Sequence, residues 1–353
     1  MAKTKESKNM LIIGGAGFIG INAARYFTDK GWTVTIFDNF SRKGTDVSVE
    51  HFKKDYPDKC TVVTGDIVKS PEKLQPLMEK NDVVLHLAAQ VAVTTSITDP
   101  RNDFEQNALG TFNVLEAVRT SKRQPMLLFA STNKVYGSLE HLSVQDAATR
   151  HEFGDDTART HGVSEKEQLD FHSPYGCSKG VADQYVIDYA RIYGLKTVVF
   201  RQSCIYGPHQ FGIEDQGWVA WFTIAAMLER PLTIFGTGKQ VRDVLYVEDL
   251  CALYEKAIEH IDTASGKAYN TGGGPSNTLS LVELIDILNN KYGYRLNPPK
   301  TEPRAGDQPV FVADIRKAVA DLGWKPRVGV EEGLKNMHDW LVEHQDILKQ
   351  FFA

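Results

Sequence analysis

Cysteine is scarce in this sequence, long apolar runs are absent and basic residues are not in excess. Of the 353 residues only four are cysteine, and no two have the CxxC spacing of redox or zinc sites. Such a chain is not a disulfide-rich secreted domain, and we expect it in the reducing cytoplasm. No stretch reaches the ~18 apolar residues of a membrane span. The 40 Lys+Arg and 45 Asp+Glu leave a net charge of −5, which argues against nucleic acid or a membrane as partner.

The remaining composition is that of an ordinary folded protein. Hydrophobic residues make up 42% and charged residues 24% of the chain, which excludes disorder, collagen and coiled coil. Because a single hydrophobic core stops growing at roughly 250–300 residues, we expect one large domain and one smaller domain.

Short β-branched apolar runs alternate with helical patterns through the first part of the chain. The expected strands are Met10–Ile13, Thr33–Phe37, Thr61–Thr64, Val83–Leu87, Met126–Ala130 and Thr197–Phe200. Helical spacing between strands is shown by Ile19, Ala23, Tyr26, Phe27, Leu109, Phe112 and Leu115. This alternation predicts a parallel sheet covered by helices on both faces. We therefore expect a Rossmann-like, doubly wound α/β fold with a smaller mixed α/β domain.

One long polar segment, 137–173, interrupts the alternation. Connections of this length are usually functional or mobile. The segment carries four histidines, His141, His151, His161 and His172. No two of them lie three or four residues apart, so we expect no metal site.

A glycine-rich turn follows the first expected strand. The string Gly14-Gly15-Ala16-Gly17-Phe18-Ile19-Gly20 satisfies both GxGxxG and GxxGxxG, and a helix follows it. Such a turn needs positive φ and lets the backbone approach a pyrophosphate, whose charge the helix N-terminus binds. Between a strand and a helix the motif predicts a dinucleotide cofactor.

Acidic residues after the next two strands refine the cofactor prediction. Asp38 ends the second expected strand, where a carboxylate accepts the adenosine ribose hydroxyls and repels a 2′-phosphate. That favours NAD over NADP. The alternative is an aspartate that only caps the turn. Asp66 and Ile67 follow the third strand, and we expect them at the edge of the adenine.

Tyr175 and Lys179 form a YxxxK pair at the start of an expected helix. Pro174 marks the helix start, and a spacing of four residues puts both side chains on one face. A phenol with a reference pKa near ~10 is a poor base, but an ammonium and a cationic nicotinamide beside it favour the phenolate. Exposed Tyr and Lys would be the alternative. Thr132, after the fifth strand, is placed to share a proton with Tyr175.

These motifs together resemble the extended short-chain dehydrogenase/reductase family that acts on nucleotide-sugars. The resemblance extends over essentially the whole chain and includes 86–89, 107–114, 236–243 and 304–307. It implies that Thr132, Tyr175 and Lys179 are catalytic, with Tyr175 as acid and base. It also implies a tightly bound NAD, regenerated in each turnover. The implied NAD contacts are Gly14, Gly17, Phe18, Ile19, Asp38, Asn39, Asp66, Ile67, Leu87, Ala88, Ala89, Gln90, Asn107, Tyr175 and Lys179.

The same resemblance implies a substrate site and a domain division. Arg242 and Arg304 are the implied diphosphate ligands, since a guanidinium fork suits phosphate. The other implied contacts are Thr94, Thr95, Ser96, Asn133, Gln202, Ser203 and Asp307, with helix capping as the alternative role of 94–96. Residues 1–204, with part of 240–272, would bind NAD. Residues 205–239 and 273–353 would bind the nucleotide-sugar.

The C-terminal part of the chain contains an amphipathic helix. Its apolar residues include Leu334, Met337, Leu341, Ile347 and Leu348. We expect them to pack in the core rather than to form an oligomer face. Dimers or tetramers are nevertheless typical of the family that the chain resembles, so we expect a homo-oligomer.

The two residues after Thr132 limit which reaction of the family we expect. In the family, dehydratases carry Asp-Glu there and decarboxylases a Glu, whereas this chain has Asn133 and Lys134. Four blocks, 90–96, 131–137, 169–180 and 210–219, resemble family members that invert C2 of a CDP-linked hexose through a 2-keto intermediate. A UDP-hexose 4-epimerase, a related GDP- or UDP-sugar epimerase and a non-catalytic NAD-binding regulator remain alternatives.

Overall fold

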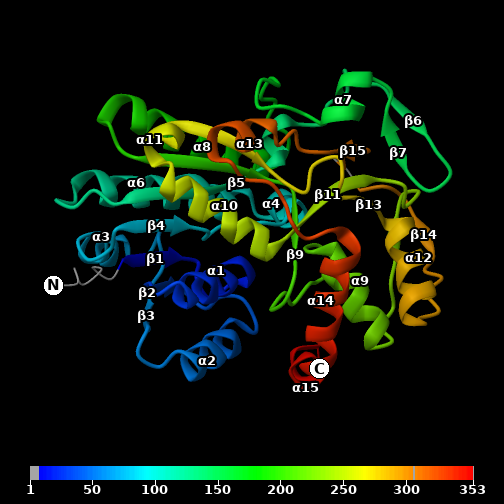
Figure 1. Ribbon diagram of the computed structural model, residues 1–353, viewed down its shortest axis with the longest axis horizontal. Coiled ribbons are helices and arrows are strands. Elements are labelled where there is room, and N and C mark those ends of the chain that lie inside the picture. The colour runs from blue at the N-terminus through cyan, green and yellow to red at the C-terminus, as the bar shows by residue number, and fades with distance from the viewer. Residues whose placement is uncertain (1–7, 305–306, 353) are drawn as a thin grey trace.

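A seven-stranded parallel sheet forms the centre of the computed structural model, which describes residues 8–304 and 307–352 (Figure 1). Its order is β12-β8-β5-β4-β1-β2-β3. The strands are β1 (Asn9–Ile13), β2 (Thr33–Asp38), β3 (Cys60–Thr64), β4 (Val83–His86), β5 (Met126–Thr132), β8 (Thr197–Gln202) and β12 (Lys267–Thr271). Six are the expected strands. The seventh comes from the returning segment 240–272.

Helices cover both faces of this sheet. On one face lie α1 (Phe18–Asp29), α2 (Thr45–Asp55), α10 (Val247–Glu259), α11 (Ile261–Ala264) and α13 (Arg316–Leu322). On the other lie α3 (Leu74–Met78), α6 (Gly110–Thr120) and α8 (Ser173–Tyr193). Along β1, Met10 and Ile12 join the first core, and Leu11 and Ile13 the second, because alternate residues of a strand point to opposite faces. The predicted doubly wound α/β fold is confirmed.

Short helices connect the elements around β4. They are η1 (Pro71–Lys73), α4 (Val93–Thr98), α5 (Pro100–Phe104) and the π-helix η2 (Glu105–Leu109), which runs into α6. The helical spacing predicted for Leu109, Phe112 and Leu115 is present. Only Leu115 is buried, however, while Leu109 and Phe112 are 38% and 40% exposed.

A second, mixed sheet lies beyond the carboxyl ends of the large one. It consists of β9 (Cys204–Tyr206), β11 (Val241–Tyr246), β13 (Thr278–Ser280) and β15 (Val310–Phe311), and a separate pair is formed by β10 (Ile234–Phe235) and β14 (Lys300–Thr301). Around it lie α9 (Trp218–Met227), α12 (Leu281–Tyr292), α14 (Val330–Glu343) and α15 (Gln345–Phe352). This part has its own apolar core, as the smaller domain requires.

The C-terminal segment contributes to both parts of the molecule. Leu334, Met337 and Leu341 are buried on α14, and Leu348 on α15, so the predicted core packing is confirmed for these four. Ile347 is only partly buried, and the expected single helix is two. Earlier in the segment, α13 packs over the large sheet. The proposed domain boundaries stay a prediction.

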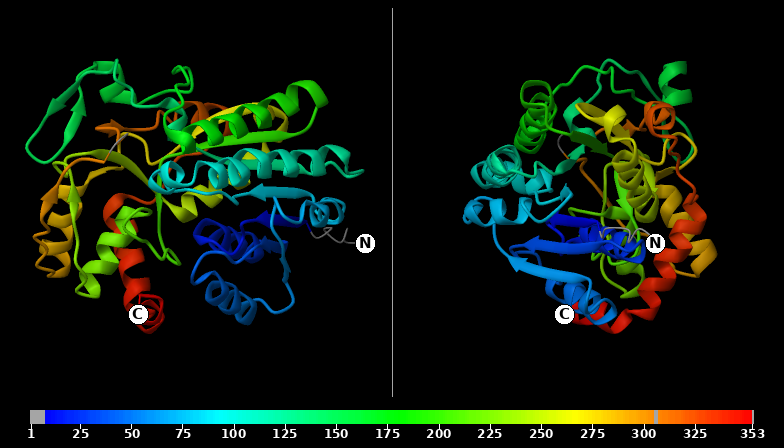
Figure 2. Two further views of the ribbon diagram at one scale, coloured as in Figure 1. Left: turned by 180° about the vertical axis from the view of Figure 1, so that it is seen from behind. Right: turned by 60° about the vertical axis from the view of Figure 1, so that its left-hand side comes forward.

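Part of segment 137–173 is tied to the smaller sheet. It follows η3 (Asn133–Tyr136) and contains the hairpin of β6 (Val144–Asp146) and β7 (His151–Phe153) and then α7 (Asp156–His161). Phe153 and Val163 are buried against 310–313, and Val163 forms a bridge with Ala313. The hairpin projects at one end of the molecule in both orientations (Figure 2).

Three chemical features concern the described residues only. No helix in them is long and apolar enough to cross a bilayer. Their four cysteines are all free thiols. No group of three or more His, Cys, Asp or Glu side chains in residues 8–304 and 307–352 is arranged to hold a metal ion.

A buried ion pair joins α8 to the large sheet. Asp183 of α8 accepts hydrogen bonds from Nε and Nη2 of Arg201 at 3.0 and 2.9 Å and from Oγ of Ser131 at 2.7 Å. The Asp183 and Arg201 side chains are 0% and 5% exposed. Because Ser131 directly precedes Thr132, the pair fixes α8 against the end of β5.

Replacing Asp183 should therefore destabilise the protein. Asp183→Ala leaves the Arg201 guanidinium buried without its partner, and such a change costs about 3–5 kcal/mol in the free energy of unfolding. The matched control is Asp188→Ala on the same helix, where a half-exposed carboxylate pairs with Arg191 at 3.3 Å, and its expected loss is below about 1 kcal/mol. Urea unfolding measures both variants. Equal losses would contradict the role of the buried pair.

Candidate active site

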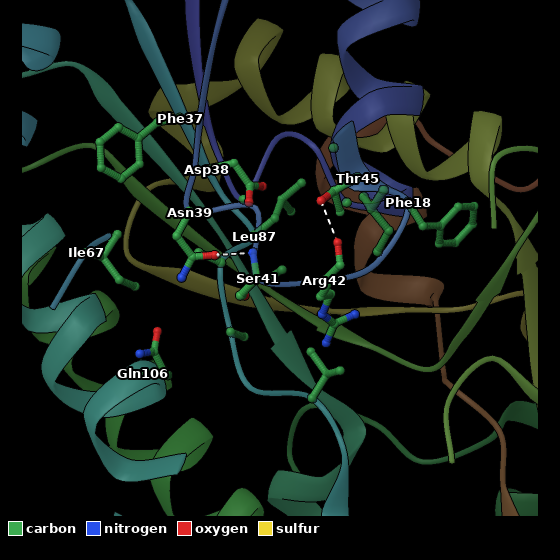
Figure 3. A pocket seen from close by; sticks show the side chains of 18 of the residues that line it. Phe18, Phe37, Asp38, Asn39, Ser41, Arg42, Thr45, Ile67, Leu87 and Gln106 are labelled. Carbon is green, nitrogen blue, oxygen red and sulfur yellow. Dashed lines mark hydrogen bonds between the residues drawn. The ribbon is translucent and has the colours of Figure 1, made fainter. Parts of the chain in front are cut away.

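A groove runs along the carboxyl ends of β1, β2, β4 and β5. Its lining comes from the glycine turn, the loop after β2, the turn after β4 and the start of α8. Figure 3 shows Asp38, Asn39, Ser41 and Arg42 at its mouth, with Ile67 and Gln106 facing them. Predicted cofactor contacts that line the groove are Gly14, Gly17, Phe18, Ile19, Asp38, Asn39, Asp66, Ile67, Leu87, Ala88, Ala89, Tyr175 and Lys179.

The glycine turn fits a pyrophosphate. Gly14 has a φ of +78°, and a Cβ there would lie 2.6 Å from the amide nitrogen of Ala88. Gly17 precedes α1, and the nearest atom to a Cβ there is the Gly14 carbonyl at 3.5 Å. At Gly20 a Cβ would lie 2.6 Å from that same carbonyl. The turn thus brings helix and strand together and leaves bare backbone at the N-terminus of a 12-residue helix, where anions bind.

Asp38 plays the capping role that was the alternative prediction. Its carboxylate accepts hydrogen bonds from the amides of Ala16 at 3.0 Å and Phe40 at 2.9 Å, and burial raises its pKa. Asp38 also lines the groove, and a carboxylate can accept more than two hydrogen bonds, so the ribose role is compatible with the cap. Asn39 donates to Oδ2 of Asp66 at 2.9 Å, which joins the two loops at the expected adenine end.

Two predicted cofactor residues support the groove from behind. Asn107 is 1% exposed. Its Oδ1 accepts from the amide of Gln90 at 2.9 Å, and its Nδ2 donates to Asp103 and to Ser178, at 3.1 and 3.0 Å. Neither Asn107 nor Gln90 is part of the groove lining. They hold the turn after β4 and the start of α8 together.

The three predicted catalytic residues lie together at the inner end of the groove. Tyr175 is buried on the first turns of α8, with its phenol close enough to the Thr132 hydroxyl for that hydroxyl to lower its pKa. Lys179 lies one turn later, 3% exposed, and its Nζ donates to the carbonyl of Ala130 at 2.6 Å. The alternative reading of an exposed YxxxK pair is therefore wrong.

Burial dominates the electrostatics of this pair. It raises the pKa of Tyr175 to about 12, while the bond with Thr132 and the charge of Arg42 lower it. Burial also lowers the pKa of Lys179 to about 7, against the charges of Asp183 and Asp103. The expectation that Lys179 lowers the pKa of the tyrosine needs correction. Its ammonium is engaged by a carbonyl, and the protein cation that acts on the phenol is Arg42.

Three of the predicted substrate residues lie next to the catalytic group. Asn133 is 8% exposed, and its Nδ2 donates to Gln308 at 3.2 Å. Gln202, also a groove residue, donates to the Tyr254 hydroxyl at 2.6 Å. Ser203 donates to the carbonyl of Asp243 at 3.1 Å. They lie at the ends of β5 and β8, where the large sheet meets the smaller one.

The two predicted diphosphate arginines are each paired with an aspartate. Nη2 of Arg242 lies 2.5 Å from Oδ1 of Asp307. Nη2 of Arg304 lies 3.3 Å from Oδ1 of Asp215. Asp307 was expected to contact the substrate, and in the structure its carboxylate pairs with Arg242.

The predicted sugar contacts after β4 lie on α4. Thr94 and Thr95 are exposed. Ser96 is fully buried, and its hydroxyl donates to the carbonyl of Val93 at 2.7 Å. The structure therefore does not bring Ser96 to the groove, because helical geometry turns it inward. None of the three caps α4, whose N-cap residue is Ala92.

Sequence reasoning missed Arg42, Gln216 and Lys134. Arg42 follows the second strand by four residues and lines the groove, as does Gln216 from the smaller domain. An arginine in the loop after the ribose-binding position is a signal that could have been used. The sequence around Gln216 contains no signal of a role in the site, because its position in the groove depends on the tertiary fold. Lys134 was noted only as not being a carboxylate.

Comparisons with known proteins agree with this geometry. A model of the family described as GDP-mannose 4,6 dehydratase matches residues 11–337. The CDP-paratose 2-epimerase of Salmonella typhi is 44% identical over 338 residues, which cover 94% of this chain and 98% of that protein.

Solved structures of nucleotide-sugar epimerases are also similar to this chain. The UDP-glucose 4-epimerase of Thermotoga maritima, solved with UDP-glucose, has a TM-score of 0.80 at 29% identity and covers 96% of this chain and 99% of its own. The UDP-glucuronic acid 4-epimerase of Bacillus cereus, solved with UDP-glucuronic acid and NAD, has a TM-score of 0.80 at 26% identity and covers 95% and 99%.

Lys134 leads to a pH prediction. Burial and the charge of Arg242 lower its pKa to about 8, although Asp307 acts in the opposite direction. Its ammonium is therefore present at pH 7 and lost by pH 9. Binding of UDP or CDP should weaken about fivefold over this range, as expected for one partly screened charge. Calorimetry at both pH values measures the effect.

The variant Lys134→Met should bind these nucleotides weakly at both pH values. Lys267→Met is the control, since that lysine pairs with Asp321 at 2.9 Å and should keep the wild-type pH dependence. Wild-type binding that is equally tight at pH 7 and pH 9 would remove Lys134 from the site.

Proposed function

Since this chain belongs to the GDP-mannose 4,6-dehydratase family and is an NAD-dependent nucleotide-sugar epimerase, we propose that it inverts C2 of a CDP-linked hexose. The proposed pair of sugars is CDP-paratose and CDP-tyvelose. The observation that carries the proposal is the pair of buried residues Thr132 and Tyr175, whose hydroxyls interact at the inner end of the groove, with an amide and an amine directly after Thr132 in the sequence. The site can move a proton on and off a sugar hydroxyl, and the two positions after Thr132 offer no carboxylate for elimination.

In the proposed mechanism a single side chain, Tyr175, both accepts and returns the proton. The groove residues would hold NAD, which would supply the acceptor and donor of the hydride. Tyr175 takes the proton from the C2 hydroxyl and gives it back after the 2-keto sugar has turned its other face to the groove. Thr132 holds the phenol and the reacting oxygen. Lys179 orients the cofactor ribose from the next turn of α8.

The position of the cations supports C2 over C4. C2 is bonded to the anomeric carbon that carries the diphosphate, whereas C4 lies across the ring. Reaction at C2 therefore requires the diphosphate close to Tyr175. Lys134 lies two residues after Thr132, its amide donates to Thr132 Oγ1 at 3.2 Å, and the charges of Arg242 and Asp307 act on its side chain. The ammonium of Lys134 thus lies between the catalytic hydroxyls and the proposed diphosphate ligands.

The reacting carbon can be identified directly. Purified protein incubated separately with CDP-paratose, UDP-glucose and GDP-mannose should convert the CDP-sugar, with inversion at C2 seen by NMR. A substrate deuterated at C2 should keep its label in the product, because the same hydride returns. Inversion at C4 of UDP-glucose would establish the 4-epimerase alternative instead. Solvent hydrogen at C2 would indicate enolisation.

Tyr175 should be required for the rate. Tyr175→Phe keeps the ring and removes the proton carrier, so kcat should fall by roughly 10²–10⁴-fold. Tyr193→Phe, at the exposed end of the same helix, should retain the wild-type rate. Circular dichroism checks the fold of both variants. A Tyr175→Phe enzyme of wild-type speed would place the acid–base group elsewhere.

We further propose that the enzyme is a homo-oligomer whose subunits pair through α6 and α8. These helices lie side by side (Figure 1). Their outer surface, with the last residue of η2 (Leu109), carries the exposed apolar side chains Leu109, Phe112, Val181, Tyr185 and Ile192. Contiguous exposed apolar surface of this kind marks an interface, and a two-fold axis would pair α6 and α8 with their copies.

Charge on this face should separate the subunits. Phe112→Glu combined with Tyr185→Glu should reduce the mass in analytical ultracentrifugation to that of one chain. Val342→Glu, at a residue of α14 that is 54% exposed, should leave the mass of the wild type. A wild-type protein that sediments as one chain at 100 μM would contradict the proposed pairing.

A further inference from the structure

Segment 209–217, which we call the clasp, passes from the smaller domain to the mouth of the cofactor groove. It leaves β9 and ends at the start of α9. A tight turn at its tip is closed by two backbone hydrogen bonds between Ile213 and Gln216, at 3.0 and 2.9 Å. The turn presents Glu214, Asp215 and Gln216 together. Glu214 and Asp215 both contact Arg304, and Gln216 contacts Arg42.

On the cofactor side, the clasp holds Arg42. Nη1 of Arg42 donates to Oε1 of Gln216 at 3.0 Å, although the two residues are 174 positions apart. Both side chains line the groove. The charge of Arg42 acts on both Asp38 and Tyr175, and Figure 3 shows the Arg42 side chain in the groove near Asp38 and Asn39. A guanidinium has five N–H donors, and the bond to Gln216 leaves others for a cofactor phosphate.

On the substrate side, the clasp holds Arg304. Its Nη1 and Nη2 each donate to the carbonyl of Glu214 at 3.4 Å, and Nη2 lies 3.3 Å from the carboxylate of Asp215. Its guanidinium carbon lies 3.9 Å from the centroid of the Phe235 ring. An arginine expected to bind the substrate diphosphate is thus held by a carboxylate of the clasp.

The base of the clasp is also joined to the cofactor loop. Phe211 stacks on Phe351 of α15 with ring centroids 4.9 Å apart. Nζ of Lys43, next to Arg42, lies 5.3 Å from the centroid of the same Phe351 ring. The clasp and the loop after β2 therefore rest on one aromatic side chain.

We propose that the clasp couples the two ligand sites, with Gln216 and Asp215 as positioning residues that retain NAD while the substrate site is empty. The proposal rests on the proposed function in one respect, the role of Arg304 as a diphosphate ligand. With no substrate, Arg304 holds Asp215, and Gln216 of the same turn holds Arg42 over the cofactor. The diphosphate of the substrate competes with Asp215 for Arg304, and the bound sugar then covers the inner end of the groove itself.

The proposal predicts that Asp215 affects substrate binding and NAD retention in opposite directions. Asp215 competes with the diphosphate, so its carboxylate weakens substrate binding and strengthens cofactor retention. Linkage requires that a change at one site appear at the other in binding free energy. A substitution that merely loosened the local structure would weaken both ligands. Opposite effects on the two ligands are therefore the signature of the clasp.

The first test measures NAD release. Holoenzyme is diluted into a solution that consumes free NAD enzymatically, and the rate of NAD loss is followed. If the protein purifies without cofactor, a titration gives the Kd for NAD instead. Gln216→Ala should release NAD about tenfold faster, the loss of one hydrogen bond to a charged group. Release at the wild-type rate would overturn the proposal.

The second test uses a matched pair of acidic residues. Asp215→Asn should release NAD two- to fivefold faster and bind CDP and UDP two- to fivefold more tightly, the range of a partly exposed ion pair. Glu214→Gln removes the same charge from the neighbouring residue, whose only described contact to Arg304 is through its backbone carbonyl. It should change neither quantity. Weaker binding of both ligands by Asp215→Asn, or equal effects of the two variants, would overturn the proposal.

The tests separate this inference from the proposed function. NAD release and nucleotide binding are measured without turnover, so they do not depend on which sugar carbon reacts. If the wild type does not invert C2 but Asp215→Asn shows the opposite shifts, the clasp is supported and the 2-epimerase assignment fails. If the wild type inverts C2 and the variants behave as wild type, the clasp fails alone.

Discussion

The approach of the Tyr175 phenol to the Thr132 hydroxyl is the contact on which the active site depends. It brings together the first turns of α8 and the end of β5, and Asp183 of α8 holds the sheet through its hydrogen bond from Ser131 of β5 and its buried ion pair with Arg201 of β8. Because protein interiors are close-packed, moving α8 would disturb the ion pair and the catalytic hydroxyls together. The packing of α8 against the sheet therefore both stabilises the sheet and aligns Tyr175.

Burial imposes an electrostatic cost on the catalytic residues. It raises the pKa of Tyr175 to about 12 and lowers that of Lys179 to about 7. Both shifts favour the neutral forms, so the protein alone does not create a phenolate at neutral pH. The charge of Arg42 reduces this shift but does not reverse it, so the phenolate needs further positive charge, which the nicotinamide ring of bound NAD would supply. The reactivity of the site thus depends on the charges gathered in the groove more than on the lysine one turn away.

Arginines paired with aspartates recur where the two domains meet. Arg242 pairs with Asp307, and Arg304 with Asp215. Each pair neutralises its cation, which limits the cost of holding positive charges close together, and in the proposed function the substrate diphosphate takes the place of the carboxylate. Lys134, next to Arg242, has its pKa lowered to about 8 by burial and by that charge. Together these groups form a region suited to a diphosphate beside the catalytic end of the groove.

The local patterns of the chain determined the doubly wound sheet, the glycine turn and the positions of Thr132, Tyr175 and Lys179, because strand burial, helix spacing and turn chemistry are short-range properties. The tertiary structure decided the rest. It turned Ser96 inward, placed Asn107 behind the groove, and brought Gln216 to Arg42 across 174 positions. It also decided the signs of the pKa shifts, since burial and neighbouring charge depend on how distant segments pack, which local sequence does not encode.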